Sequence, residues 1–226
     1  ELSCFVLTDG TSYKILPYAK DYKRIGEGDK GLNTGGMGAI SPVPFANKEF
    51  LKKVEERIIV PTINGLKSDN LPYKGFIFIG LIMVNNEPYV IEYNVRMGDP
   101  ETQVVLPRLK TDFLDLMIST AQGSLAEREI EIIDETYSNI VMVAGGYPEN
   151  YEKGNIITGI PEDTNSTIIF HAGTKHVNNN ILTNGGRVLS IVSKGQDHNE
   201  AVSKSYKVIE KINYKNKNYR KDIGFD

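Results

Sequence analysis

The sequence has a single cysteine, no apolar run long enough to cross a membrane, and no excess of positive charge. Cys4 has no partner within the chain, which excludes a disulfide framework and a cysteine-based zinc site. The longest apolar run, residues 76–84, suits a strand, since a bilayer span needs about 20 residues. A net charge of -3 gives no electrostatic basis for binding nucleic acid. We therefore expect a cytoplasmic protein with neither nucleic acid nor membrane as a partner.

The length and composition suit one large domain or two small ones. The chain has 226 residues, of which 40% are hydrophobic and 24% are charged, so it can bury a full core. Residues 1–8 already read as a strand, without an initiator Met or a leader before them. We expect that an N-terminal part of the polypeptide lies elsewhere.

The hydrophobic pattern predicts an α+β fold with mainly antiparallel pairing. Helices are expected over residues 47–60, after Thr111 until Gly123, and after Asp197. Strands are expected at residues 1–8, 12–18, 75–84, 88–93, 139–144, 167–170 and 187–192. The polar stretch 126–136 reads as a connection. The prediction is therefore one domain over residues 1–126 and a second over 127–226.

A polar triad ends one of these strands. Because side chains alternate along a strand, Glu92, Asn94 and Arg96 are expected to share a face at the end of a buried strand. A carboxylate and an amide oxygen suit Mg²⁺, which also keeps places for water and phosphate. A guanidinium grips phosphate through two donors. The triad predicts a site for a metal-bound phosphate; the alternative is an edge strand with chance polar residues.

Residues 23–38 are rich in glycine. Residues 26–31 fit the letters of the dinucleotide-binding fingerprint, but no strand precedes them and no helix follows, so a Rossmann site is rejected. The segment is expected to be a flexible loop whose backbone N–H groups approach phosphate or ribose, with Lys23 and Arg24 supplying positive charge. The alternative is a simple surface loop.

Long ordered motifs along the whole chain closely resemble one family, the glycinamide ribonucleotide synthetases (phosphoribosylamine-glycine ligases), which have an ATP-grasp fold. The motifs are DYKR at 21–24, NTGGMGA at 33–39, EYNVRMGDPETQ at 92–103, AGGYP at 144–148, FHAGT at 170–174, GGRVL at 185–189 and YRKDIG at 219–224. The resemblance implies that residues 1–126 are the C-terminal half of an ATP-grasp domain and residues 127–226 the family's C-terminal domain. It also implies that the family's N-terminal domain and the first half of the ATP-grasp are absent from this chain.

The resemblance implies an activity in purine biosynthesis, the ligation of glycine to 5-phosphoribosylamine with ATP and Mg²⁺ (or Mn²⁺) through a glycyl phosphate. Glu92 and Asn94 would hold the metal, and Arg96 would neutralise charge on the transferring phosphoryl group. Asp99 and Glu101 are the other expected catalytic residues. The expected substrate-binding residues are Lys23, Arg24, Asn33, Thr34, Gly35, Gly36 and Gly38.

Some features depart from the family pattern or leave alternatives open. Residues 80–83 are apolar where many ATP-grasp enzymes carry a further acidic ligand, and Tyr22 replaces the family's usual His. His171 is interpreted as a hydrogen-bonded structural residue. Two other functions remain open from the sequence: another ATP-grasp carboxylate–amine ligase, or a non-catalytic fragment that acts as an interaction module.

Overall fold

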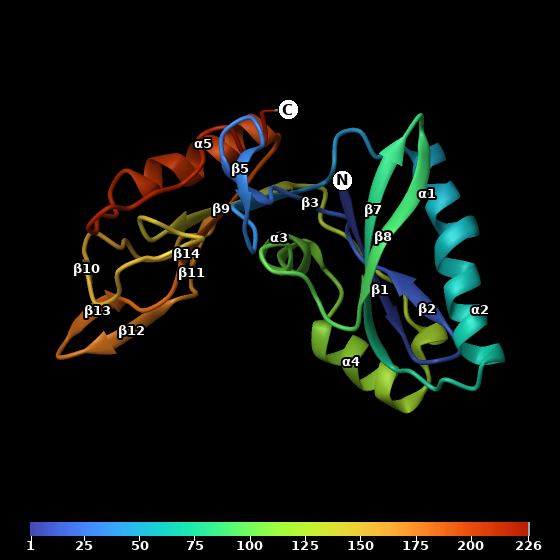
Figure 1. The fold of residues 1–226 in the computed structure, drawn as a ribbon. Helices are drawn as coiled ribbons and strands as arrows, with labels where there is room; N and C mark the ends of the chain where they lie inside the picture. The colour runs from blue at the N-terminus through green and yellow to red at the C-terminus, as the bar shows by residue number, and fades with distance from the viewer. Residues whose placement is uncertain (226) are drawn as a thin grey trace. The chain divides into compact units, whose positions relative to one another are not determined.

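The computed structural model describes residues 1–225 and confirms the α+β class (Figure 1). The chain divides into two compact units, each described here by itself. Unit 1 comprises Glu1–Lys20, Pro42–Gly98 and Val105–Asp134. Unit 2 comprises Asp21–Ser41, Asp99–Val104 and the chain from Glu135 onward. Neither unit is a continuous stretch of sequence, and the domain boundary after residue 126 stays a prediction.

Unit 1 is built on a four-stranded antiparallel sheet. Its order is β2 (Tyr13–Ile15), β1 (Leu2–Thr8), β7 (Gly75–Val84) and β8 (Glu87–Asn94). Asn85 and Asn86 join β7 to β8 with φ of 53° and 61°, the left-handed pair that a tight hairpin turn requires. The sequence-based prediction of this hairpin is confirmed.

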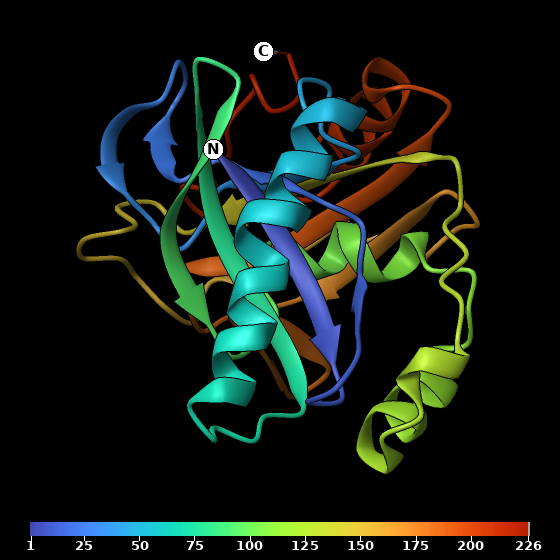
Figure 2. The ribbon, with the colours of Figure 1, turned by 90° about the vertical axis from the view of Figure 1, so that its right-hand side faces the viewer.

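One face of that sheet is covered by a long helical segment (Figure 2). It runs through α1 (Lys48–Val54), the π-helical η1 (Glu55–Ile59) and α2 (Val60–Ser68), with Asn47 as the N-cap. The predicted end at residue 60 is wrong, because the helical segment continues through Pro61, directly after a π-helical turn in which the Val60 N–H donates to the Glu55 carbonyl five residues back. Apolar residues of the segment, including Phe50 and Ile59, pack on Leu2, Cys4, Val6, Ile77, Ile79 and Leu81.

The remainder of unit 1 follows the short helices α3 (Thr102–Val105) and η2 (Leu106–Arg108). Helix α4 (Phe113–Gln122) begins at the N-cap Asp112 and ends at Gly123, which has φ of 81°. The single turn η3 (Leu125–Glu127) comes next, and its Leu125 N–H donates to the buried Asp9 carboxylate at 3.1 Å.

Among the described residues, no helix combines the length and the apolar content that a membrane span requires.

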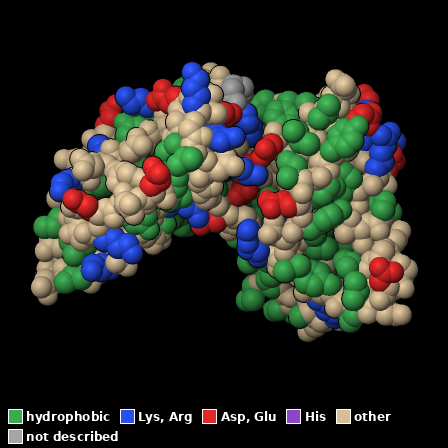
Figure 3. Space-filling model, viewed as in Figure 1, with side chains coloured by type: hydrophobic (Ala, Val, Ile, Leu, Met, Phe, Trp, Pro, Cys, Tyr) green, Lys and Arg blue, Asp and Glu red, His purple; other side chains and the backbone are tan. Residues whose placement is uncertain are grey.

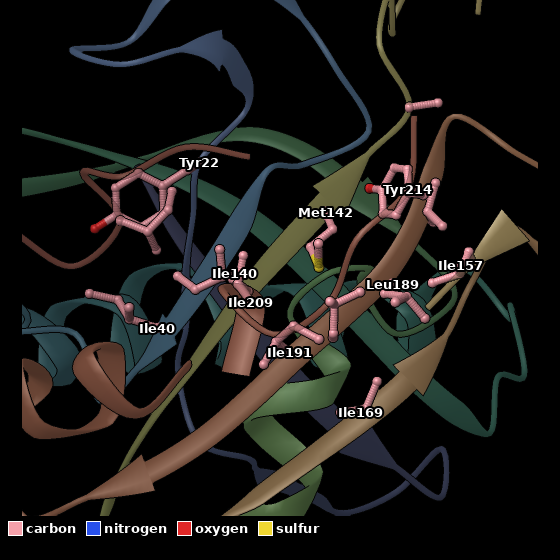
Figure 4. Close-up of a cluster of buried hydrophobic side chains, with 14 residues drawn as sticks. Tyr22, Ile40, Ile140, Met142, Ile157, Ile169, Leu189, Ile191, Ile209 and Tyr214 are labelled. Atoms are coloured by element: carbon pink, nitrogen blue, oxygen red, sulfur yellow. The ribbon is translucent and has the colours of Figure 1, made fainter. Parts of the chain in front are cut away.

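Unit 2 has a five-stranded sheet at its centre. Its order is β11 (Thr167–His171), β14 (Arg187–Gly195), β9 (Thr136–Val143), β6 (Gly38–Ser41) and β3 (Lys20–Asp21). Helix α5 (His198–Ile209), with the predicted N-cap Asp197, packs on this sheet. Figure 4 shows the resulting core, in which Ile140, Leu189 and Ile191 of the sheet belong to one buried cluster with Ile209 of the helix. A smaller sheet joins β10 (Ile156–Ile157), β13 (Asn180–Thr183) and β12 (Thr174–Val177).

Part of the glycine-rich segment forms a strand pair, so the prediction of a loop throughout residues 23–38 is wrong. Within it, β4 (Arg24–Gly26) and β5 (Lys30–Asn33) form a hairpin. Buried Arg220 holds this hairpin, because its guanidinium donates to the Asp29 carboxylate at 2.7 Å and to the Arg24 carbonyl at 3.1 Å. The Asp222 carboxylate accepts hydrogen bonds from the same guanidinium and from the Gly28 N–H. The sequence analysis had predicted that backbone N–H groups of this segment, such as that of Gly28, bind phosphate or ribose.

Tyr22, which departs from the family pattern, belongs to this structural cluster. Its side chain is buried, and its hydroxyl accepts a hydrogen bond from the Gly224 N–H at 3.0 Å. The Arg220 guanidinium lies over its ring at 5.3 Å from the ring centroid. The tyrosine therefore fastens the C-terminal segment to the start of the glycine-rich segment.

Candidate functional site

Glu92 and Asn94 lie on one face of β8, in unit 1. In the β7–β8 ladder Glu92 is opposite Gly80 and Asn94 is opposite Phe78, so the predicted shared face of these two residues is confirmed. A Cβ at position 80 would lie 3.0 Å from the Glu92 Cγ, so the glycine gives the Glu92 side chain room to lie across β7. Within the described chain, the Glu92 carboxylate has no hydrogen bond or ion pair.

The Asn94 side chain suits a ligand next to this carboxylate. Its Nδ2 is buried and has no hydrogen-bond partner among the described residues. An amide can be turned to exchange its nitrogen and oxygen, which would place an acceptor there. No group of three or more His, Cys, Asp or Glu side chains in the described chain could hold a metal. A carboxylate and an amide fit Mg²⁺, which completes its shell with water and phosphate oxygens.

The strand that carries this pair is largely exposed, so the prediction of a buried strand is wrong. Among the strands of the described residues, β8 is the edge of its sheet and pairs only with β7. Tyr89, Tyr93 and Val95 are 56%, 50% and 72% exposed. An apolar run indicates that a strand packs against apolar neighbours. It does not show whether those neighbours belong to the same chain.

Arg96 does not share the strand geometry of the pair. It lies beyond the end of β8, so the alternation that relates Glu92 to Asn94 does not extend to it. Its side chain is exposed, and its Nη1 donates to the Met97 carbonyl at 3.0 Å. The prediction that all three residues share one strand face is therefore wrong for Arg96.

The predicted substrate-binding residues lie in unit 2, and their polar groups are largely engaged there. Lys23 pairs with Asp21 at 3.8 Å, and the Arg24 Nη1 donates to the Gly31 carbonyl at 2.8 Å. Asn33 is exposed, and Gly38 is buried at the start of β6.

The backbone N–H groups of residues 34–37 are all used within the protein. Thr34 donates to the Lys23 carbonyl, Gly35 to the Tyr147 hydroxyl, Gly36 to the Thr34 hydroxyl and Met37 to the Tyr22 carbonyl, at 2.7–2.9 Å. A phosphate cradle built from these N–H groups, as predicted, would require the chain to give up these bonds. The substrate contacts of this segment would have to come from side chains and carbonyl groups.

Asp99 and Glu101 follow in unit 2 with different surroundings. The Asp99 carboxylate accepts two hydrogen bonds from Arg187, at 3.0 and 3.2 Å, and one from Gln103 at 3.1 Å. Glu101 is buried. The sequence analysis missed Arg187 as a partner of Asp99, because the two residues are 88 positions apart in the sequence.

His171 has the hydrogen bond expected of a structural residue. Its Nδ1 lies 3.0 Å from the Thr174 hydroxyl, at the turn between β11 and β12. The side chain is exposed.

Comparison with known proteins identifies the family. Residues 1–102 match the family model of the phosphoribosylglycinamide synthetase ATP-grasp (A) domain, and residues 137–226 match that of the C domain of the same synthetase. The chain belongs to the phosphoribosylglycinamide synthetase family. The predicted resemblance is thereby confirmed.

Several relatives match almost the whole chain. A phosphoribosylamine–glycine ligase of Chlorobaculum tepidum is 42% identical over 99% of this chain and 53% of its own length. A bifunctional purine biosynthetic protein of Pichia angusta is 46% identical over 99% of the chain and 29% of its own length. The chain thus spans about half the length, or less, of these curated relatives.

Solved structures agree on the fold. The crystal structure of phosphoribosylamine–glycine ligase from Thermotoga maritima is 37% identical, with a TM-score of 0.89 over 98% of this chain and 55% of that one. A biotin carboxylase from Campylobacter jejuni, solved as a beta-gamma-ATP complex, has a TM-score of 0.67 at 15% identity. The latter likeness concerns the fold alone.

Proposed function

We propose that this protein acts as an ATP-dependent ligase that joins glycine to 5-phosphoribosylamine, giving glycinamide ribonucleotide, ADP and phosphate through a glycyl phosphate. Membership of the family and the names of the relatives support the substrates. The observation that carries the chemistry is the pair of Glu92 and Asn94 on one strand face. The Glu92 side chain has room over Gly80, and the buried Asn94 Nδ2 has no hydrogen-bond partner among the described residues.

Unit 1 would contribute the phosphate chemistry. Glu92 and Asn94 would hold Mg²⁺ (or Mn²⁺), which when bound screens the charge of the ATP phosphates. The exposed Arg96 guanidinium would neutralise charge on the transferred phosphoryl group. Activation of a carboxylate by phosphorylation needs positioning and charge compensation rather than a protein nucleophile.

Unit 2 would contribute the residues at the glycine and phosphoribosylamine end. Lys23 and Arg24 supply positive charge. A phosphate could replace the contact of Lys23 with Asp21 and that of Arg24 with the Gly31 carbonyl. Asp99 and Glu101 supply carboxylates. The other proposed residues of this end are Asn33, Thr34, Gly35, Gly36 and Gly38.

We also propose that the apolar edge of unit 1 is covered, in the working enzyme, by the half of the ligase that this chain does not span. Figure 3 shows apolar side chains gathered over the β7–β8 region of unit 1. Next to β8, a groove of about 540 Å³ has an apolar lining; it includes Thr62, Leu66, Leu71, Ile77, Tyr93 and Val95. An open strand edge beside an apolar groove is the usual binding site for an added segment of chain.

Nucleotide binding tests this proposal. A chimera is made in which this chain replaces the matching part of the Chlorobaculum tepidum ligase, and Mg-ATP binding is measured by calorimetry. We expect Glu92→Ala and Asn94→Ala each to weaken binding by at least tenfold, about 1.4 kcal/mol. Glu127→Ala removes an exposed carboxylate elsewhere in unit 1 and is the matched control. Unchanged affinity in both variants would overturn the metal assignment.

A further inference from the structure

Arg187 connects two motifs that are far from it in the sequence. It begins β14, and its guanidinium donates to the Gly35 carbonyl at 2.7 Å and to the Asp99 carbonyl at 2.9 Å. The same guanidinium binds both oxygens of the Asp99 carboxylate. A planar fork with several donors can satisfy such a set of acceptors, whereas an ammonium group cannot.

Tyr147 binds the second backbone polar group of Gly35, its N–H. The Gly35 N–H donates to the Tyr147 hydroxyl at 2.9 Å, so both backbone groups of this glycine are bound by side chains. A Cβ at position 35 would lie 3.2 Å from the Arg187 Cζ and 3.3 Å from the Tyr147 hydroxyl oxygen. The Tyr147 ring in turn lies against Gly186, where a Cβ would be 2.2 Å away. The glycines at 35 and 186 therefore make this close approach possible.

Two more contacts complete the cluster. Gly36 has φ of 113°, and a Cβ there would lie 2.3 Å from the Pro100 Cδ. The buried Asn139 side chain donates to the Pro100 carbonyl at 2.9 Å. Residues 33–38 and 99–101, both proposed for the substrate end, are thus locked to each other and to β9 and β14.

We propose that Arg187 and Tyr147 are positioning residues, which hold residues 33–38 and Asp99 in the arrangement that the ligation needs. This inference rests on the proposed function. The Asp99 carboxylate makes a two-point contact with Arg187 and so fixes the position of that guanidinium. Through Arg187, Asp99 is connected to the Gly35 carbonyl and so to the backbone of residues 33–38.

Amide hydrogen exchange on the 226-residue chain tests whether these side chains hold the segment. Tyr147→Phe removes the acceptor of the Gly35 N–H, and Arg187→Lys removes most of the donors to Gly35 and Asp99. We expect exchange at Gly35 and Gly36 to be about tenfold faster in each variant. Arg128→Lys is a matched control, since Arg128 makes a similar two-point contact with Asp115 in unit 1. Tyr206→Phe is the control for loss of a hydroxyl. Unchanged exchange at Gly35 would overturn the proposal.

Kinetics of the chimera test whether the arrangement serves the reaction. We expect Arg187→Lys to raise KM for phosphoribosylamine, or to lower kcat, by about tenfold or more, with KM for ATP unchanged. General damage to the fold would change all of these constants together. Faster exchange with kinetics equal to those of Arg128→Lys would refute a positioning role. A chimera that makes no product before any substitution contradicts the proposed function, and the exchange result still decides whether Arg187 and Tyr147 hold the segment.

Discussion

Replacement of Gly36 by alanine tests how tightly the glycine-rich segment is locked. The φ of 113° at Gly36 is one that residues with a side chain rarely adopt, and the added Cβ would lie 2.3 Å from the Pro100 Cδ. Pro100 cannot move away freely, because the Asn139 amide holds its carbonyl at 2.9 Å. The substitution therefore combines backbone strain with overpacking.

The two costs can be added from known ranges. A left-handed backbone costs a residue with a side chain about 1–2 kcal/mol, and an extra carbon in a packed site costs about 1–3 kcal/mol. We expect Gly36→Ala to destabilise unit 2 by about 2–5 kcal/mol. Gly154 offers a matched control, because it has φ of 84° but nothing within 4 Å of an added Cβ. Gly154→Ala should cost only the backbone part, about 1–2 kcal/mol.

Urea unfolding followed by circular dichroism measures these differences. Gly65→Ala provides a control of opposite sign, since Gly65 lies in α2 with open space around its Cα. Alanine there should stabilise unit 1 by about 0.5–1 kcal/mol. If Gly36→Ala cost no more than Gly154→Ala, the contact between Gly36 and Pro100 would not be rigid, and the argument for a locked segment would fail.

Two further substitutions probe unit 1. Arg96→Lys in the chimera should lower kcat by about a hundredfold or more, because an ammonium cannot present a planar fork to phosphate oxygens; near wild-type turnover in steady-state kinetics would show that Arg96 does not act on the phosphoryl group. Asp9→Asn should destabilise the chain at pH 7 by about 1–3 kcal/mol, measured by urea unfolding. Burial alone would raise the pKa of Asp9, but hydrogen bonds from the N–H groups of Ser12, Thr11 and Leu125 hold it below its usual value. Stability from a carboxyl with a lowered pKa is present above its unfolded pKa, about 4, and is lost as the pH falls further, so the difference from wild type should shrink at lower pH; a constant difference would contradict this account.

Local sequence signals predicted the regular elements well. Asn47, Asp112 and Asp197 cap helices because their side chains accept from backbone N–H groups three residues on, an interaction within one turn of chain. The Asn85–Asn86 turn is equally local, and it sets the pairing of β7 with β8 from Val84–Glu87 to Leu81–Val90; a one-residue register shift then places Glu92 opposite Gly80. These interactions depend on neighbours in sequence, so the sequence reveals them.

The errors concern contacts between distant residues. The order of residues 23–38 depends on Arg220, Tyr147 and Arg187, which lie more than a hundred residues further along the chain. The exposure of β8 depends on which chain segment lies next to it, and its apolar composition gives no information about that. Nothing next to Arg187 in the sequence indicates that its partner is Asp99, which lies 88 residues before it.

The most direct measurement is the formation of glycinamide ribonucleotide from glycine, phosphoribosylamine and Mg-ATP, detected by mass spectrometry. We predict that the chimera makes this product with one ADP released per molecule, and that omission of glycine abolishes both. The 226-residue chain alone is predicted to make none, because an open site does not exclude water or align the reacting groups. Glycine-independent ADP release by the chimera, or synthesis by the chain alone, would contradict the account.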